Sequence, residues 1–130
     1  MSDRNAKLVE RFLALALDQR FDPLGEILHD QFELVEPASL PYGGVYRGAG
    51  GYETFVRALT GVFELTAFDV QFAIAGKDRV ALRSDVGFRA RTTGREARVP
   101  VVELLSVRDG KLARSEVFLQ DTALLLQLLG

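Results

Sequence analysis

Four consecutive segments in the second half of the chain alternate between apolar and polar residues. The segments are Thr66–Ala75, Arg79–Thr92, Val99–Val107 and Lys111–Gln120. Alternation with a period of two places successive side chains on opposite faces of a strand. The junctions carry turn residues, namely Gly76, Gly94 and the pair Asp109 and Gly110. The sequence therefore predicts four consecutive antiparallel strands.

The first half of the chain has mainly helical spacing. The first predicted helix ends near Leu17, and a short second helix, capped by Asp22, runs through about Leu28. A strand is predicted over Phe32–Pro37. It is followed by a loop over 38–51, with one short pairing around Val45, and by a helix over Tyr52–Leu65. Helices followed by a run of strands indicate one α+β domain, with the helices on one face of a curved sheet.

Glu103 is the one charged residue in Val99–Val107, where apolar residues fall on both faces of the predicted strand. A carboxylate in a covered strand costs several kcal/mol if it stays ionised without a partner. Burial favours the neutral form by raising the pKa, and the neutral carboxyl is a hydrogen-bond donor. Glu103 is therefore a candidate site residue. The alternative is a structural role, in which it pairs with an arginine of a neighbouring strand or lies at an interface.

Glu36 is the second candidate, because it shares a strand face with Phe32 and Leu34. The alternative here is a carboxylate at the end of a strand that turns to water.

Composition excludes several classes of function. The 130 residues contain no cysteine, so thiol catalysis, zinc thiolate sites and disulfides are impossible, and a single histidine argues against a metal site built on imidazoles. We therefore expect neither a metal nor a cofactor. With 16 basic and 18 acidic residues, the chain lacks the charge of a nucleic-acid or anionic membrane binder. No apolar run is long enough to span a membrane and no export signal is visible, so we expect a cytoplasmic protein.

The apolar outer face of the Val99–Val107 strand and the tail Leu124–Leu129 have no partner in this arrangement. Helices can cover only one face of the sheet, so these surfaces need another subunit. We expect a homodimer with an isologous interface.

The order of elements, with LVEP ending the first strand, PYGGVYRG in the loop and VRDGKLARSEVFLQD near the C-terminus, resembles the nuclear transport factor 2-like (NTF2-like) superfamily. Within it, the chain is most similar to the SnoaL-like and ketosteroid-isomerase-like branch. The resemblance covers nearly the whole chain. It implies a cone-shaped roll of the cystatin/NTF2-like kind, in which a strongly curved, mostly antiparallel sheet wraps around three helices and encloses an apolar cavity. The superfamily includes enzymes, binding proteins and scaffolds, so the fold alone does not give an activity.

The resemblance also assigns roles to both acids. Ketosteroid isomerases have a catalytic base directly before a proline, where this chain has Glu36 before Pro37, and a protonated second acid that corresponds to Glu103 when counted from Gly94. The tyrosine that binds the oxyanion in that family corresponds to Phe12, and its supporting tyrosines correspond to Leu28 and Val56. The loss of one oxyanion donor typically lowers the rate by about two to three orders of magnitude, which argues against steroid isomerisation itself.

A second branch, the limonene-epoxide-hydrolase-like enzymes, uses an Arg-x-Asp pair that Arg83 and Asp85 imitate. Asp85 is one residue out of phase with the cavity face, and a shift of one residue turns a strand side chain to the other side. Gln120 occupies the position of that branch's last aspartate. A surface ion pair explains Arg83 and Asp85 better.

Our hypothesis from the sequence is a cavity that binds a small, apolar, carbonyl-bearing molecule, with isomerase- or cyclase-like proton transfer. Glu36 is assigned as general base and Glu103 as neutral donor. The residues assigned to substrate binding are Phe12, Tyr42, Tyr46, Val86, Phe88, Val101, Val117 and Leu119, with Tyr42 or Tyr46 at the mouth. The alternative is a non-catalytic module that binds a ligand or another protein. The missing tyrosines favour the module, whereas two acids on apolar faces favour the enzyme.

Overall fold

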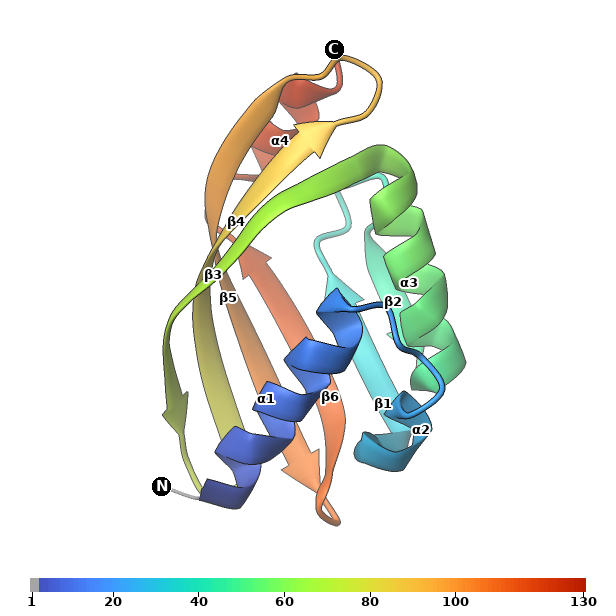
Figure 1. Cartoon of the computed structure of the whole chain (residues 1–130), viewed down its shortest axis with the longest axis vertical. Coiled ribbons are helices and arrows are strands. Elements are labelled where there is room, and N and C mark those ends of the chain that lie inside the picture. Colours follow the sequence, from blue (N-terminus) through green and yellow to red (C-terminus); the bar gives the residue numbers. More distant parts are fainter. Residues whose placement is uncertain (1–2) are drawn as a thin grey trace.

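The structure is a computed structural model that describes residues 3–130 of the chain. The elements in chain order are α1 (Asp3–Leu17), α2 (Leu24–Ile27), β1 (Leu28–Glu36), β2 (Gly44–Arg47), α3 (Gly48–Val62), β3 (Phe63–Ala75), β4 (Arg79–Ala90), β5 (Glu96–Arg108), β6 (Lys111–Leu119) and α4 (Thr122–Leu128). Figure 1 shows a long, curved sheet with α1 and α3 lying across its concave face. This arrangement confirms the predicted α+β roll.

The strands form one sheet in the order β2-β1-β6-β5-β4-β3. Strands β3 to β6 are an antiparallel meander, as the alternation predicted. Asp109 and Gly110 have φ values of 54° and 74°, the left-handed conformation that a tight hairpin turn requires. β6 then pairs in parallel with β1, which the local pattern did not predict. This pairing places β1 two strands away from β5.

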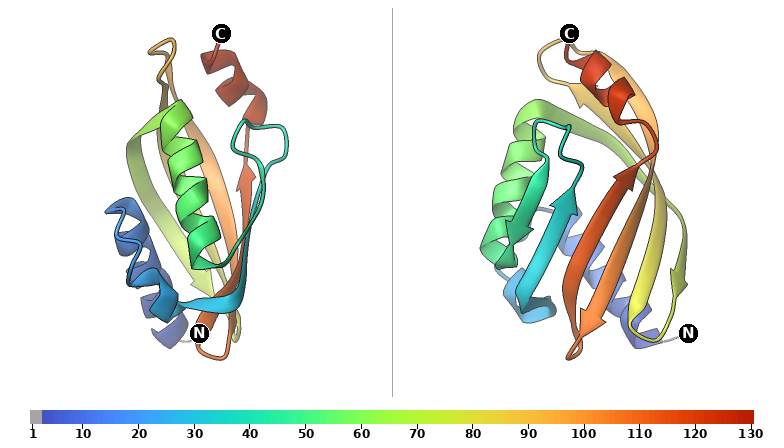
Figure 2. Two further views of the ribbon diagram at one scale, coloured as in Figure 1. Left: turned by 90° about the vertical axis from the view of Figure 1, so that its right-hand side faces the viewer. Right: turned by 180° about the vertical axis from the view of Figure 1, so that it is seen from behind.

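The core lies between the concave face of the sheet and the helices. Figure 2 (left) shows α1 and α3 on the same side of the sheet. The two helices bury one stripe each, made of Val9, Phe12 and Leu15 on α1 and Tyr52, Phe55, Val56 and Leu59 on α3. In β4 every second residue is buried, in agreement with the alternation of its sequence: Val80, Leu82, Ser84, Val86, Phe88 and Ala90. Burying these stripes is the main force that holds the helices to the sheet.

The terminal segment forms α4, which packs against β4 and β5 and buries Leu125 and Leu128. Asp121 caps this helix, because its Oδ1 accepts a hydrogen bond of 3.0 Å from the backbone N–H of Leu124. Asp121 thus satisfies one of the backbone N–H groups that the first turn of a helix leaves without a partner.

Several predicted boundaries are wrong. Asp22 does not cap α2; Pro23 is the N-cap residue and makes no side-chain capping bond. α3 begins at Gly48 instead of Tyr52, so the glycine-rich segment belongs partly to a helix. A Cβ at Gly51 would lie 3.1 Å from the carbonyl carbon of Tyr46, which shows why glycine suits this tight junction between β2 and α3. α3 ends at Val62, so Phe63 and Leu65 lie in β3.

Candidate functional site

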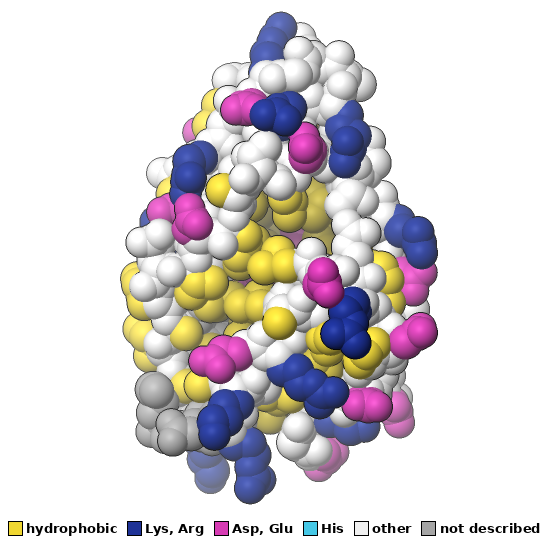
Figure 3. Space-filling view, viewed as in Figure 1, with side chains coloured by type: hydrophobic (Ala, Val, Ile, Leu, Met, Phe, Trp, Pro, Cys, Tyr) yellow, Lys and Arg dark blue, Asp and Glu magenta, His cyan; other side chains and the backbone are white. Residues whose placement is uncertain are grey.

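A cavity of about 390 Å³ lies between the concave face of the sheet and helices α1 and α3. This volume is within the range of about 300 to 1,000 Å³ that is usual for small-molecule sites. Figure 3 shows that this side of the molecule is hollowed, with hydrophobic side chains inside and charged ones around it. Polar side chains of Gln19, Thr60, Glu64 and Arg91 contribute to the lining. The cavity therefore combines apolar walls with a few polar groups.

Most of the residues that the sequence assigned to a site line this one cavity. They are Phe12, Glu36, Tyr42, Val86, Phe88, Val101, Glu103, Val117 and Leu119. Tyr46 is not among the lining residues; its hydroxyl donates a hydrogen bond of 2.8 Å to the backbone carbonyl oxygen of Tyr42. Tyr46 thus fixes the loop that carries Tyr42.

Glu36 is the last residue of β1 and lies on the buried face that also carries Phe32 and Leu34. Its exposed fraction is only 6 %. Within residues 3–130 its carboxyl group has no hydrogen-bond partner. Burial, and to a smaller extent the charge of Glu103, raises the pKa of Glu36 well above its ordinary value of 4.5. Burial therefore favours the neutral form of Glu36.

Glu103 is half-buried on β5, on the same face as Val101 and Leu105, and faces the cavity. Burial raises its pKa to about 7, although the Ser115 hydroxyl opposes the shift. Ser115 Oγ on β6 donates a hydrogen bond to Glu103 Oε2 at 3.3 Å. A donor favours the ionised form of a carboxyl group. Glu103 is therefore the acid of this pair that loses its proton more readily.

The two carboxyl groups cannot both ionise easily in apolar surroundings, since like charges repel strongly where water is scarce. Such a pair titrates as a unit and holds one proton over a range of pH. A site of this kind can accept a proton on one carboxylate while the other carboxyl group donates a hydrogen bond. This capability follows from the residues of the chain and needs no bound group.

Two residues that the sequence analysis did not assign to the site also belong to it. Tyr52 lines the cavity from α3, and both acids raise the pKa of its buried hydroxyl, after the larger effect of burial. Its spacing with Phe55, Val56 and Leu59 on one helical face was a usable signal. Ser115 shares a face of β6 with Val117 and Leu119, so alternation could have identified it as well.

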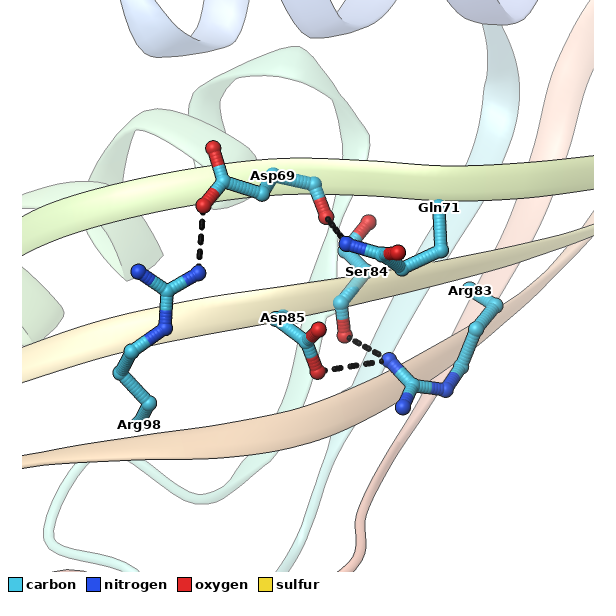
Figure 4. Close-up of polar contacts among 6 residues, drawn as sticks. All are labelled: Asp69, Gln71, Arg83, Ser84, Asp85 and Arg98. Atoms are coloured by element: carbon cyan, nitrogen blue, oxygen red, sulfur yellow. Dashed lines mark hydrogen bonds and ion pairs between the residues drawn. The ribbon is translucent and has the colours of Figure 1, made fainter.

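Arg83 and Asp85 lie on the outer face of the sheet, away from the cavity. Arg83 Nη1 and Asp85 Oδ1 form an ion pair at 2.9 Å, and Figure 4 shows it beside a second pair between Arg98 and Asp69. The predicted surface ion pair is confirmed. Asp85 cannot act in the cavity as the aspartate of an Arg-x-Asp pair would.

Two further features of the described chain concern metals and membranes. Within residues 3–130, no three histidine, aspartate or glutamate side chains gather in a group that could hold a metal ion. No helix over the same range is both long and apolar enough to cross a membrane.

Comparison with known proteins gives a consistent result. A family model described as a SnoaL-like domain matches residues 9–115. Among solved structures, an NTF2-like protein from Burkholderia xenovorans LB400 superposes with a TM-score of 0.90 at 19 % identity, covering 100 % of this chain and 98 % of that one. No curated protein matches the sequence.

Two other solved structures carry more specific names. A protein from Jannaschia sp. CCS1, named as a SnoaL-like polyketide cyclase, has a TM-score of 0.84 at 17 % identity, over 100 % of this chain and 96 % of that one. TerC, co-crystallised with polyporic acid, has a TM-score of 0.85 at 22 % identity, over 98 % of both chains. At these identities the likeness shows the fold alone.

Proposed function

The chain belongs to the SnoaL-like domain family, and from that premise we propose that its cavity binds a small, apolar, carbonyl-bearing molecule and moves a proton on it. The observation that carries the proposal is the pair of acids, Glu36 and Glu103, which line one apolar cavity and both have a raised pKa. Perturbed acids in a cleft are characteristic of sites that transfer protons.

The proposed step uses one carboxylate and one neutral carboxyl group. The carboxylate takes a proton from the carbon next to the ligand's carbonyl group, and the electron pair moves to the oxygen to give an enolate. The neutral carboxyl group donates a hydrogen bond to that oxygen. Return of the proton to the same or another carbon restores the carboxylate, so the cycle balances without an oxidant or a cofactor.

We assign the base to Glu103 and the neutral donor to Glu36, the reverse of the roles expected from the sequence. The hydrogen bond from Ser115 favours a negative charge on Glu103. Glu36 is more deeply buried and has no donor among the described residues, so its neutral form is favoured. Its carboxyl group then carries the proton that the ligand oxygen needs.

The test is exchange of carbon-bound hydrogen in 2-tetralone, a bicyclic ketone, followed by NMR in deuterium oxide. The wild-type protein should speed the exchange at the carbon next to the carbonyl group. Glu103→Gln should abolish this effect, because an amide cannot accept the proton. Glu36→Gln should keep part of it, because an amide N–H still donates to the oxygen. The opposite order would restore the roles expected from the sequence.

The second candidate function is a non-catalytic binding module, which the phenylalanine at position 12 and the apolar residues at 28 and 56 favour. In that case 2-tetralone binds to the protein, but its carbon-bound hydrogen exchanges no faster than it does without the protein. Both glutamine variants should then leave its affinity unchanged and raise stability. This outcome would end the proposal of proton transfer and leave a ligand-binding cavity.

The proposal also includes a homodimer formed through the outer face of the sheet. Seen from behind in Figure 2 (right), strands β1, β6, β5 and β4 are not covered by α1 and α3. The strand register turns four large apolar side chains to this face, and each is more than 40 % exposed: Phe72, Ile74, Leu104 and Phe118. An apolar face of this kind is typical of an interface between subunits.

A further inference from the structure

Tyr52 holds an unusual place in the cavity, because its hydroxyl lies in the field of both acids. Tyr52 is on the cavity side of α3, one helical turn before Val56. Its ring centroid lies 5.1 Å from that of Phe12 and 6.2 Å from that of Phe32, both in edge-to-face geometry. A third ring, Phe55, lies at 5.7 Å. Packing on several sides fixes the ring and therefore the direction of its hydroxyl.

The hydroxyl of Tyr52 has no hydrogen-bond partner within residues 3–130, although the side chain is buried. Within residues 3–130, Ser84 Oγ is the one enclosed side-chain polar atom without a hydrogen-bond partner, so the Tyr52 hydroxyl remains accessible from the cavity that this side chain lines. Burial and the two carboxyl groups also raise its pKa well above 10, so it keeps its proton and can only act as a neutral donor or acceptor.

The other two tyrosines near the site are less suitable donors. Tyr46 already uses its hydroxyl on the carbonyl oxygen of Tyr42. Tyr42 packs edge-to-face on Phe55 and Phe63, and among the carboxyl groups only Glu36 raises its pKa. Tyr52 lines the same cavity as Glu36 and Glu103, and its hydroxyl is not used by another residue within residues 3–130. A ligand that fills this cavity can therefore meet the Tyr52 hydroxyl as well as the two acids.

We propose that the Tyr52 hydroxyl is a second hydrogen-bond donor to the ligand's oxygen, beside the neutral carboxyl group of Glu36, and that the site selects neutral molecules with a carbonyl oxygen. This inference rests on the proposed function. An enolate oxygen accepts two hydrogen bonds well, and two fixed donors stabilise its charge better than one. The carboxylate of Glu103 repels an anionic ligand, which limits the class to neutral ketones and related carbonyl compounds.

The experiment compares two probes with the same carbon skeleton, 2-tetralone and tetralin, of which only the first has an oxygen. Their dissociation constants are measured by NMR titration for the wild type and for Tyr52→Phe. We expect Tyr52→Phe to raise the dissociation constant of 2-tetralone by about three- to tenfold, which corresponds to the loss of one net hydrogen bond. The dissociation constant of tetralin should not change. Thr54→Ala removes an exposed hydroxyl of the same helix, outside the cavity; this variant is the matched control and should change neither constant.

The other outcomes overturn the inference in distinguishable ways. Unchanged affinity for both probes would mean that the hydroxyl does not touch the ligand. An equal loss of affinity for both probes would mean that the Tyr52 ring contributes only packing. If the same loss appeared in Tyr42→Phe instead, Tyr42 would be the donor. Failure of the wild type to bind either probe would refute the proposed function itself. Should Tyr52→Phe not fold, the wild type must still prefer 2-tetralone over tetralin by at least about threefold.

Discussion

Glu36 on β1 and Glu103 on β5 line the same cavity from strands that are not neighbours, since β6 lies between them. Two strand spacings separate their backbones by about 10 Å. The charge of Glu103 nevertheless raises the pKa of Glu36, because apolar walls screen the interaction less than water does. The ionisation of Glu36 therefore depends on Glu103, although the two acids come from distant parts of the chain.

The coupling predicts an effect of one acid on the other. Glu103→Gln should lower the pKa of Glu36, because it removes the negative charge that disfavours ionisation. Carbon-detected NMR of the side-chain carboxyl groups measures this shift. Glu53→Gln on α3, where Glu53 pairs with Arg57, is the control and should leave Glu36 unchanged. A Glu36 pKa that does not respond to Glu103→Gln would show that the two acids act separately.

Stability should fall as the pH rises through neutrality. The pKa of Glu103 is about 7 in the folded protein, whereas that of an ordinary glutamate is 4.5. As the pH rises, the unfolded chain therefore releases this proton at a lower pH than the folded protein does. The stabilisation is fully present below the unfolded pKa and is lost as the pH passes the folded one. We expect a loss of about 3 kcal/mol from this group. Urea unfolding at a series of pH values measures it.

The Glu103→Gln variant should show a weaker dependence of the free energy of unfolding on pH. At high pH this variant should be more stable than the wild type. Glu10→Gln on the exposed side of α1 should keep the wild-type slope. A wild-type stability that stays constant between acidic and mildly alkaline pH would contradict the burial of an ionisable pair.

Ser115 tunes Glu103, so Ser115→Ala should raise the pKa of Glu103 further. The variant removes the hydroxyl that donates to Oε2 at 3.3 Å, and with it a bond that favours the charged form. The same NMR titration detects the change. Ser106→Ala, on β5 but on the outer face, should have no effect. A lowered Glu103 pKa in Ser115→Ala would exclude this role.

Two glycines should respond to alanine in opposite directions. A Cβ at Gly87 would overlap Oγ1 of Thr66 and lie 3.2 Å from the backbone nitrogen of Ala67, so Gly87→Ala should destabilise by about 1 to 3 kcal/mol. A Cβ at Gly61 in α3 meets nothing within 4 Å, so Gly61→Ala should stabilise by about 0.5 to 1 kcal/mol. Thermal unfolding compares the two variants. A Gly87→Ala variant that is as stable as the wild type or more stable would show that β3 and β4 are not packed this closely.

The outer face predicts the effect of a charge on assembly. Leu104 is 43 % exposed at the centre of the apolar face, and Leu104→Glu should convert a dimer into a monomer without lowering stability within the subunit. Sedimentation velocity measures the change. Lys7→Glu on the exposed side of α1 should keep the wild-type state. A monomeric wild type would refute the proposed interface.

Local patterns predicted much of this fold, for identifiable reasons. The alternation of β4 correctly gave its buried set from Val80 to Ala90, because a strand reverses its side chains at every residue. The junction between Arg47 and Tyr52 was misplaced, since three glycines there disfavour a helix that tertiary packing nevertheless stabilises. Tyr52 therefore lies inside α3 instead of at its beginning, and it lines the cavity together with both acids.

The sequence by itself determined which residues share a face, because the repeat of a helix or strand follows from backbone geometry alone. It placed Glu36 among Phe32 and Leu34, and Glu103 inside an apolar strand. Only the tertiary structure decided that Glu36, Glu103 and Tyr52 line one cavity, because that depends on β6 pairing in parallel with β1 and on α3 crossing the concave face. Those are contacts between distant segments, and no local pattern encodes them.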